Sequence, residues 1–467
     1  MDMMINGKHV TAKETFEVFN PATLELVGTA PRSGPEELEQ AVRAAKAAQK
    51  MWCRQNVLTR RQALRKAAGL IQENRQEIAH LLTLEQGKPI SEAVTEVYIA
   101  SAMLGSFASI EFESQILKQD DKSRVTLLRK PLGVVATITP WNFPLGILCW
   151  KLGPAVLAGN AVISKPASFT PLSTLKLIEL INQAFPPGVV NSLSGPGSIG
   201  AEMVKHPEIR KVSFTGSVEI GKGVMRDASE HLKRLTLELG GNDPAIILDD
   251  ADVDKIANSI YTNAFQNAGQ ICINIKRVYA HERVYSRLVS QLTEIAKACK
   301  VGPGVEPDTQ MGPLNNKSQL VFVEELIEDA RERGGRILAG GERLPGTKGY
   351  FLKPTIVTDL DDSARLVAEE QFGPALPILP FRDIDDAVQR ANDSLFGLGA
   401  SVWGGDVTRA CAVAAEVNAG TTWVNQHYKL EPDVPFGGQR QSGLGRELGI
   451  WGIEEFCELQ IVNAKTG

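Results

Sequence analysis

The feature that most constrains this chain is an alternation, between residues 130 and 240, of short β-branched runs with segments of helical character. The β-branched runs are Val134–Ile138, Ala161–Ser164, Val189–Leu193, Val212–Phe214 and Leu235–Glu238. Stretches of helical character, such as Leu172–Phe185 and Ile199–Lys205, lie between them. Strands that alternate with helices predict βαβ units and a parallel sheet that is covered by helices on both faces.

A second region of the same kind predicts a second α/β unit. Its expected strands are Ala245–Leu248, Arg277–Ala280, Ile337–Leu338, Leu376–Pro380, Ala400–Trp403 and Thr422–Asn425. Its expected helices are Val284–Lys300 and Gln319–Arg333, and two more helices are expected near the N-terminus, at 36–50 and 58–84. The segments 122–130 and 458–464 alternate polar and apolar residues, so we expect them to pair as a small sheet, at a subunit interface.

Charge and cysteine content exclude several classes of function. The chain has 467 residues, 50 Lys and Arg against 55 Asp and Glu, and no run of like charges, so we expect no nucleic-acid partner. Six cysteines without a CxxC pair argue against a zinc site or a disulfide framework, and they suit a reducing compartment. No apolar stretch is long enough to span a membrane. We therefore expect a soluble, cytoplasmic protein without a bound metal.

Three turns that follow expected strands are candidates for phosphate or ribose binding. Gly195–Gly200 matches GxGxxG, but no acidic residue ends a strand about 20 residues later, so we interpret it as a strand-to-helix turn. Gly216 and Ser217 would place free amides at a helix N-terminus, which favours an anion. Lys165 closes an expected strand, where ligands sit in open α/β sheets, although a solvated lysine remains an alternative.

Three further residues have the character of catalytic groups. Cys272 follows a Gly-Gln-Ile sequence, and its spacing leaves a reactive thiolate and a buried apolar thiol equally open. Glu238 ends an expected strand before Gly240 and Gly241. Two interpretations of it stay open, a general base and a hydrated carboxylate. Asn142 lies in the turn PWNFP. Two interpretations of it stay open, an oxyanion donor and a part of a packed aromatic corner.

Taken in order, these segments resemble the NAD(P)-dependent aldehyde dehydrogenase superfamily. The matching motifs are PWNFP (140–144), WKLGPAVLAGNAVISKPAS (150–168), FTGSVEIG (214–221), LELGG (237–241), GQIC (269–272), EEQFGP (369–374) and PFGGQRQSGLGRE (435–447). The resemblance implies a Rossmann-type cofactor-binding domain (1–121 and 131–238), an α/β catalytic domain (239–445) and a small β oligomerisation element (122–130 and 446–467). It also implies a homodimer or a homotetramer.

The resemblance implies a role for each candidate. Cys272 would be the nucleophile, Glu238 the general base, and the Asn142 side chain would form the oxyanion hole with the Cys272 N–H. The implied cofactor-binding residues are Trp141, Lys165, Ser168, Gly216, Ser217, Glu370 and Phe372. The implied reaction is oxidation of an aldehyde to the carboxylic acid with NAD(P)⁺, through a thiohemiacetal and a thioester on the cysteine.

Two departures from the family pattern bear on specificity. Ser168 stands where many NAD-preferring members carry an acidic residue, which would repel a 2′-phosphate, so we expect NADP or NAD to be accepted, with NADP slightly favoured. The implied substrate tunnel is apolar and consists of Phe143, Ile147, Trp150, Ile271, Ile273, Leu430 and Phe436. An apolar tunnel favours an aliphatic or aromatic aldehyde. Some of these side chains could instead face the core, and the nearby His427, Tyr428 and Lys429 could favour a semialdehyde of the succinic type.

Two rival functions remain at this stage. An acylating dehydrogenase would transfer the thioester to coenzyme A, but it has no need of a hydrolytic base such as Glu238. A nucleotide-binding scaffold without turnover would have no need of Cys272, Glu238 and Asn142 together.

Overall fold

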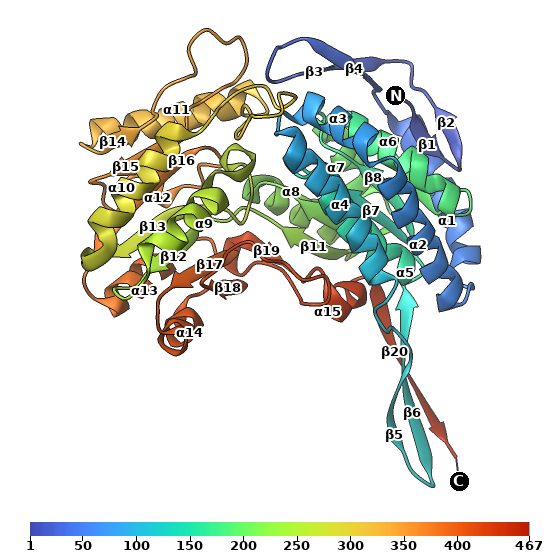
Figure 1. The fold of residues 1–467 in the computed structure, drawn as a ribbon. Helices are drawn as coiled ribbons and strands as arrows, with labels where there is room; N and C mark the ends of the chain where they lie inside the picture. The colour runs from blue at the N-terminus through green and yellow to red at the C-terminus, as the bar shows by residue number, and fades with distance from the viewer. Residues whose placement is uncertain (467) are drawn as a thin grey trace.

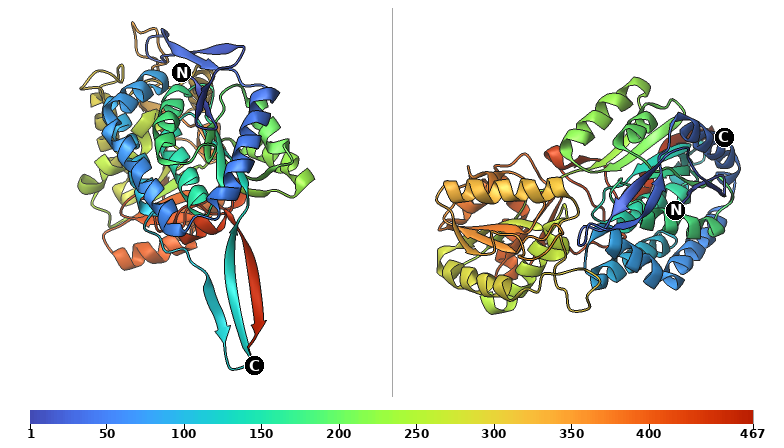
Figure 2. Two further views of the ribbon diagram at one scale, coloured as in Figure 1. Left: turned by 90° about the vertical axis from the view of Figure 1, so that its right-hand side faces the viewer. Right: turned by 90° about the horizontal axis from the view of Figure 1, so that it is seen from above.

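The structure, a computed structural model, describes residues 1–466. Two α/β units lie side by side, and a slender β arm projects from one of them and carries the C-terminal end of the chain (Figures 1 and 2). Each unit contains its own sheet, one of six strands and one of seven. The predicted α/β class is therefore confirmed.

The first sheet has the strand order β19-β11-β10-β7-β8-β9. Its strands are β7 (Val134–Ile138), β8 (Ala161–Lys165), β9 (Val190–Ser192), β10 (Ile209–Thr215), β11 (Arg234–Glu238) and β19 (Gly443–Leu444). The five strands predicted for this region are all present and run parallel, while β19 returns from the far end of the chain and pairs antiparallel with β11. The carboxyl ends of the five parallel strands therefore meet at one edge of the sheet.

Helices cover both faces of this sheet. They are α1 (Pro35–Trp52), α2 (Val57–Glu73), α3 (Arg75–Gln86), α4 (Ile90–Phe107), α5 (Pro144–Leu157), α6 (Leu172–Ile181), α7 (Gly197–Lys205) and α8 (Val218–Ala228). Val135 belongs to the core formed with α2–α5, whereas Val134 and Ala136 belong to the core formed with α1, α7 and α8. This alternation has the period of two that a strand imposes on its side chains.

The single helix predicted over 58–84 is wrong, because the chain turns between α2 and α3 at Asn74. The Asn74 side chain donates a hydrogen bond to the carbonyl oxygen of Leu70 (2.8 Å) and so satisfies the last turn of α2. Asparagine side chains compete in this way with the helical backbone.

The second sheet has the strand order β14-β15-β16-β13-β12-β17-β18. Its strands are β12 (Asp243–Ile247), β13 (Ile275–His281), β14 (Arg336–Ala339), β15 (Thr355–Thr358), β16 (Ala375–Phe381), β17 (Gly399–Trp403) and β18 (Thr421–Val424). The six predicted strands are confirmed, and β15 was not predicted from the sequence. Six strands run parallel, and β14 is an antiparallel edge. Helices α9 (Val253–Phe265) and α10 (Glu282–Ala298) pack in one core, and α13 (Ile384–Asn392) and α14 (Val407–Glu416) in another.

Two more helices, α11 (Lys317–Glu332) and α12 (Arg365–Ala368), pack in a further core of this unit. Other elements include the N-terminal strands β1 (Met3–Ile5), β2 (Lys8–Val10), β3 (Thr15–Phe19) and β4 (Leu26–Pro31), and the short helix α15 (Gly449–Glu454). Among residues 1–466, none of the helices combines the length and the apolar character that a membrane crossing requires.

The arm confirms the predicted pairing of the two alternating segments. Strand β6 (Ser123–Pro131) pairs antiparallel with β20 (Cys457–Lys465) over its whole length. A third strand that the sequence did not indicate, β5 (Gln115–Gln119), adds to the other side of β6. The exposed apolar side chains of the arm include Ile116, Leu459 and Ile461. In the isolated chain, this sheet therefore presents apolar side chains to solvent. Its strands project away from the two units (Figure 1).

Candidate active site

A cavity of about 270 Å³ lies where the carboxyl ends of β7, β10 and β11 face the second unit. It is lined by the three predicted catalytic residues and by five of the seven predicted cofactor-binding residues, which are Trp141, Gly216, Ser217, Glu370 and Phe372. Its remaining lining residues, which the sequence analysis did not single out for binding, are Pro140, Thr215, Leu239, Gly240 and Gln319. Parallel strands present ligand sites at this edge of a sheet.

A second, apolar cavity of about 130 Å³ adjoins the first. All seven residues predicted for the substrate tunnel line it: Phe143, Ile147, Trp150, Ile271, Ile273, Leu430 and Phe436. The sequence analysis missed Ile99 and Met103 from α4, and Gly146, which also line it. Cys272 and Asn142 line both cavities, so they lie at the junction of a polar chamber and an apolar one.

The turn before Cys272 has a backbone conformation that residues other than glycine rarely adopt. Asn267 and Ala268 have φ values of 52° and 53°, and Gly269 follows with φ 74°. The Glu92 carboxylate accepts a hydrogen bond from the Asn267 N–H (3.0 Å) and helps to hold this turn. Backbone strain of this kind costs on the order of 1–3 kcal/mol per residue and persists only where the surrounding structure imposes it.

The Asn142 side chain is held against the same turn. Its amide nitrogen donates to the carbonyl oxygen of Gln270 (2.9 Å), which uses one of its two N–H groups and leaves the other for a ligand. The Asn142 main-chain carbonyl accepts from the ammonium of Lys88 (2.8 Å). Lys88 in turn is buried, pairs with Glu96 (2.5 Å) and lies over the Phe143 ring. The predicted oxyanion donor is thus fixed from two sides.

Glu238 is a buried carboxylate beside the thiol. Within residues 1–466, neither of its oxygens has a hydrogen-bond partner. Burial, and after it the charge of Glu447, raises the pKa of Glu238 to about 8. Burial, and after it Glu238, likewise raises the pKa of the Cys272 thiol well above its ordinary value, while the charge of Lys276 lowers it. The pair is poised to hold protons at neutral pH.

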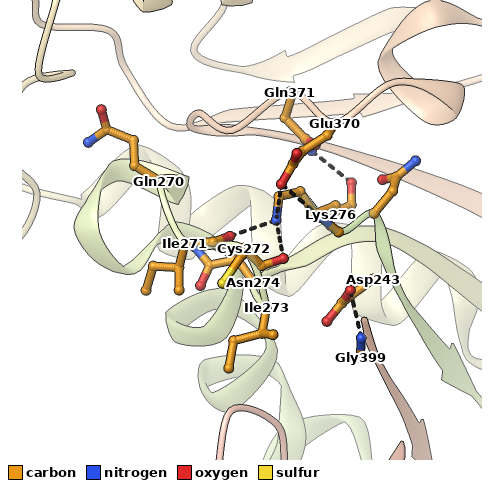
Figure 3. A network of polar contacts seen from close by, with 12 residues as sticks. Asp243, Gln270, Ile271, Cys272, Ile273, Asn274, Lys276, Glu370, Gln371 and Gly399 are labelled. Carbon is orange, nitrogen blue, oxygen red and sulfur yellow. Dashed lines mark hydrogen bonds and ion pairs between the residues drawn. The ribbon is translucent and has the colours of Figure 1, made fainter. Parts of the chain in front are cut away.

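Two buried lysines close to this pair were not predicted to be functional. Lys151 pairs with Glu447 and donates to the Ser213 hydroxyl (3.1 Å), and its charge lowers the pKa of Glu238. Lys276 donates to the carbonyl oxygens of Ile271 and Cys272, as Figure 3 shows. The available signal was the position of Lys276, four residues after the nucleophile candidate.

Lys165 and Ser168 lie outside the polar cavity, at the end of β8 and on the loop after it. Burial lowers the pKa of Lys165 to about 8, and its ammonium donates to the carbonyl oxygen of Pro166 (3.0 Å). Ser168 donates to the carbonyl oxygen of Gly195 (2.8 Å). The GxGxxG match is a turn between β9 and α7, as interpreted, and its Gly200 lies against the Lys165 side chain. The discounted motif therefore adjoins the predicted ribose-binding residues.

The lining of the polar cavity suits the nicotinamide half of a dinucleotide. The Thr215 hydroxyl is buried and, in the part of the chain described, has no hydrogen-bond partner. Gly216 and Ser217 precede the N-terminus of α8, which favours an anion, but the Gly216 N–H is not free as predicted, because it donates to the carbonyl oxygen of Glu238 (3.1 Å). The Trp141 and Phe372 rings meet edge to face, 5.4 Å between centroids, and offer flat apolar walls. These features fit a polar, planar ligand.

The charged residues near the apolar cavity do not line it. Arg277 is buried and donates to the carbonyl oxygens of Asn242 (3.0 Å) and Ala391 (2.8 Å). Lys429 is exposed and pairs with Glu431 (3.1 Å). Tyr428, a residue with a hydroxyl group, does line the apolar cavity. His427 does not line it, and its Nε2 is hydrogen-bonded to the carbonyl oxygen of Ile273 (2.7 Å).

Comparisons with known proteins agree with this geometry. The model of the aldehyde dehydrogenase family matches residues 9–462. A Gibberella moniliformis protein named as aldehyde dehydrogenase FUS7 is 39% identical over 97% of this chain and 96% of its own. A Sinorhizobium fredii protein named as an NADP(+) succinate-semialdehyde dehydrogenase is 38% identical over 96% of this chain and 92% of its own.

A solved structure has nearly the same fold. The NAD⁺ complex of an aldehyde dehydrogenase from Bacillus cereus superposes with a TM-score of 0.98 and 38% identity, over 100% of this chain and 97% of that one. The agreement extends over both α/β units and the arm. The chain therefore belongs to the aldehyde dehydrogenase family, whose members are NAD(P)-dependent oxidoreductases.

Proposed function

We propose that Cys272, Glu238 and Asn142 carry out the oxidation of an apolar aliphatic or aromatic aldehyde to its carboxylic acid. The observation that carries this proposal is the position of Cys272 and Asn142 at the junction of the polar and apolar cavities, with Glu238 beside the thiol. An aldehyde whose chain fills the apolar cavity presents its carbonyl at this junction.

Each residue has a distinct chemical task. The Cys272 thiolate attacks the aldehyde carbon, and the resulting oxyanion accepts hydrogen bonds from the free Asn142 N–H and the Cys272 backbone N–H. A bound nicotinamide supplies the acceptor for the hydride that leaves this carbon. Glu238 then takes a proton from water as the water attacks the thioester, which releases the acid and restores the thiol.

Residues around the polar cavity are proposed to hold the cofactor. Trp141, Gly216, Ser217 and Phe372 would line the nicotinamide end, with Glu370 on the nicotinamide ribose. Lys165 would bind the adenosine ribose, because its buried ammonium has no carboxylate partner in the described part of the chain and gains most from a polar ligand.

A burst experiment tests the central proposal. Rapid mixing of enzyme, cofactor and hexanal should give a burst of reduced nicotinamide in the native protein, and Cys272→Ala should abolish it. A protein that binds the cofactor but shows no burst with any aldehyde would be the scaffold instead.

The substrate class is proposed from the apolar lining of the second cavity. We expect kcat/KM for hexanal or benzaldehyde to exceed that for succinic semialdehyde about tenfold or more, because no described cation lines the cavity to pair with a distal carboxylate. The alternative is a semialdehyde dehydrogenase, and it is favoured by the name of the Sinorhizobium fredii relative. Comparable turnover of both substrate types would remove the basis for the apolar preference.

We further propose that NADP is slightly favoured over NAD, because Ser168 presents no carboxylate to repel a 2′-phosphate. A kcat/KM for NAD ten times that for NADP would contradict this.

We propose three domains. The cofactor domain comprises 1–121 and 131–238, the catalytic domain comprises 239–445, and the oligomerisation domain comprises 122–130 and 446–467. The exposed apolar side chains of the arm support a homodimer or homotetramer, and six free thiols support a cytoplasmic location.

A further inference from the structure

Lys276 is a buried cation that contacts both the loop of the nucleophile and Glu370, which lines the cofactor cavity. Its ammonium donates to the carbonyl oxygens of Ile271 (2.6 Å) and Cys272 (2.9 Å). The same ammonium lies 3.6 Å from a carboxylate oxygen of Glu370, and only 1% of its side chain is exposed. Figure 3 shows the three contacts radiating from this one nitrogen.

The first contact fixes the direction of the Cys272 N–H. The Ile271 carbonyl and the Cys272 N–H belong to one peptide group, which is planar and trans, so the two bonds point in opposite directions. With the Ile271 oxygen held on Lys276, the Cys272 N–H faces away from the ammonium. This N–H is the backbone donor that the proposed mechanism assigns to the oxyanion.

The third contact reaches the loop that lines the cofactor cavity. The Glu370 oxygen beside Lys276 also accepts from the Gly241 N–H (3.1 Å). A side chain at position 240 would collide with the Glu370 carboxylate, so glycine is required there if the carboxylate is to keep this position. The carboxylate is thus held between a backbone N–H and the lysine.

Two buried carboxyl groups, Asp243 and Glu370, face Lys276, and Asp243 accepts from the Gly399 N–H (3.0 Å). Burial raises the pKa of Asp243 to about 7 and also raises the pKa of Glu370, and the Lys276 charge opposes the shift in both. Arg277 and the neutral, buried His427 are the other titratable groups of this cluster. Loss of the ammonium would leave two buried carboxylates with less compensation.

We propose that Lys276 is a positioning residue, whose single ammonium orients the Cys272 peptide and restrains Glu370 so that nucleophile and cofactor site keep a fixed relation. The proposal rests on the function proposed above, in which Cys272 attacks the aldehyde. It goes beyond that function because Lys276 touches neither the substrate cavity nor the polar cavity.

The test uses the variants Lys276→Met and Lys276→Gln, of which the second is neutral but keeps a hydrogen-bond donor and so perturbs folding less. The matched control is Lys211→Met, which removes a lysine that is equally buried and pairs with Glu455 (3.3 Å) but lines neither cavity. Two readouts are measured: the pH profile of Cys272 alkylation by iodoacetamide, followed by peptide mass spectrometry, and the rate of the reduced-cofactor burst.

Both readouts should change in the Lys276 variants and not in the control. The groups that face the thiol within residues 1–466 include Glu238, Glu370, Tyr428 and Lys276, of which Lys276 is the cation. Its removal should move the alkylation midpoint upward by about one pH unit. The burst should slow by roughly tenfold or more, since loss of an oxyanion donor costs on the order of 10²–10³-fold.

The outcomes separate this proposal from the proposed function. A folded Lys276→Gln protein whose burst rate stays within about threefold of the native rate would overturn the positioning role. A slower burst with an unchanged alkylation profile would also overturn it, because a general structural defect would then suffice. Absence of a burst in the native protein would refute the proposed function itself.

Discussion

Replacement of Glu238 by Gln should separate the two halves of the proposed reaction. The amide has nearly the shape of the carboxyl group but is not a base, so attack by Cys272 and hydride loss should continue while thioester hydrolysis slows. Loss of a positioned general base costs roughly 10²–10⁴-fold in the step that it serves. The burst should therefore remain, and the steady-state rate after it should fall by that factor.

The pH dependence of the native enzyme follows from the buried position of Glu238. Burial and the Glu447 charge raise its pKa to about 8, and the base acts only when ionised. About one molecule in ten is then ionised at pH 7, and about ten in eleven at pH 9. Hydrolysis of the acyl-enzyme should thus accelerate about tenfold between these two values, with the rate rising as pH rises.

The assay follows the acyl-enzyme directly. Protein mixed with cofactor and hexanal is quenched at set times between pH 6.5 and 9.5, and the mass of the acylated protein gives the decay rate. The control is Cys272→Ala, which should carry no adduct. The reasoning fails if Glu238→Gln hydrolyses its adduct within about threefold of the native rate, or if native hydrolysis is flat between pH 7 and 9.

Three further predictions concern the cofactor, the support of the oxyanion donor and the arm. Ser168→Glu should lower kcat/KM for NADP by about tenfold or more and spare NAD, because it places a negative charge against the 2′-phosphate; an unchanged NADP/NAD ratio would refute the role of this position. Lys88→Met should reduce the free energy of unfolding by about 3–5 kcal/mol in urea titrations, since it leaves Glu96 buried and unpaired. Lys118→Met, which breaks an exposed ion pair, should change the free energy of unfolding by less than about 1 kcal/mol. Equal changes in the Lys88 and Lys118 variants would contradict the argument. Deletion of 458–467 should convert the proposed oligomer to a monomer in light scattering, and an unchanged mass would show that the arm is not the interface.

Local sequence determined most of the secondary structure. The runs around Val134 and Ala161 are β-branched or small, and they are bounded by turn residues, so their local sequence predicts strands. The division between α2 and α3 escaped this reasoning, because Asn74 lies inside a helical composition and breaks the helix through one hydrogen bond to Leu70. Strand β5 escaped for a related reason, since it becomes a strand only by pairing with β6.

The candidate site divides in the same way. Cys272, Glu238 and Asn142 were recognisable because each stands in a short motif, and the tunnel residues because the family alignment carries them. Lys276, Ile99 and Met103 carry no such local signal. Their roles depend on which surfaces face one another after folding, and a helix such as α4 presents apolar side chains to the core and to a cavity alike.

The sequence by itself determined the order of strands and helices, the α/β class and the candidate catalytic residues, because these depend on residues close together along the chain. Tertiary structure decided the surroundings of these residues. It buried Glu238 with no hydrogen-bond partner among residues 1–466, seated Glu370 between Gly241 and Lys276, and placed the Lys276 ammonium on the Ile271 carbonyl. Desolvation and charge pairing depend on distances in space, and a linear pattern does not contain those distances.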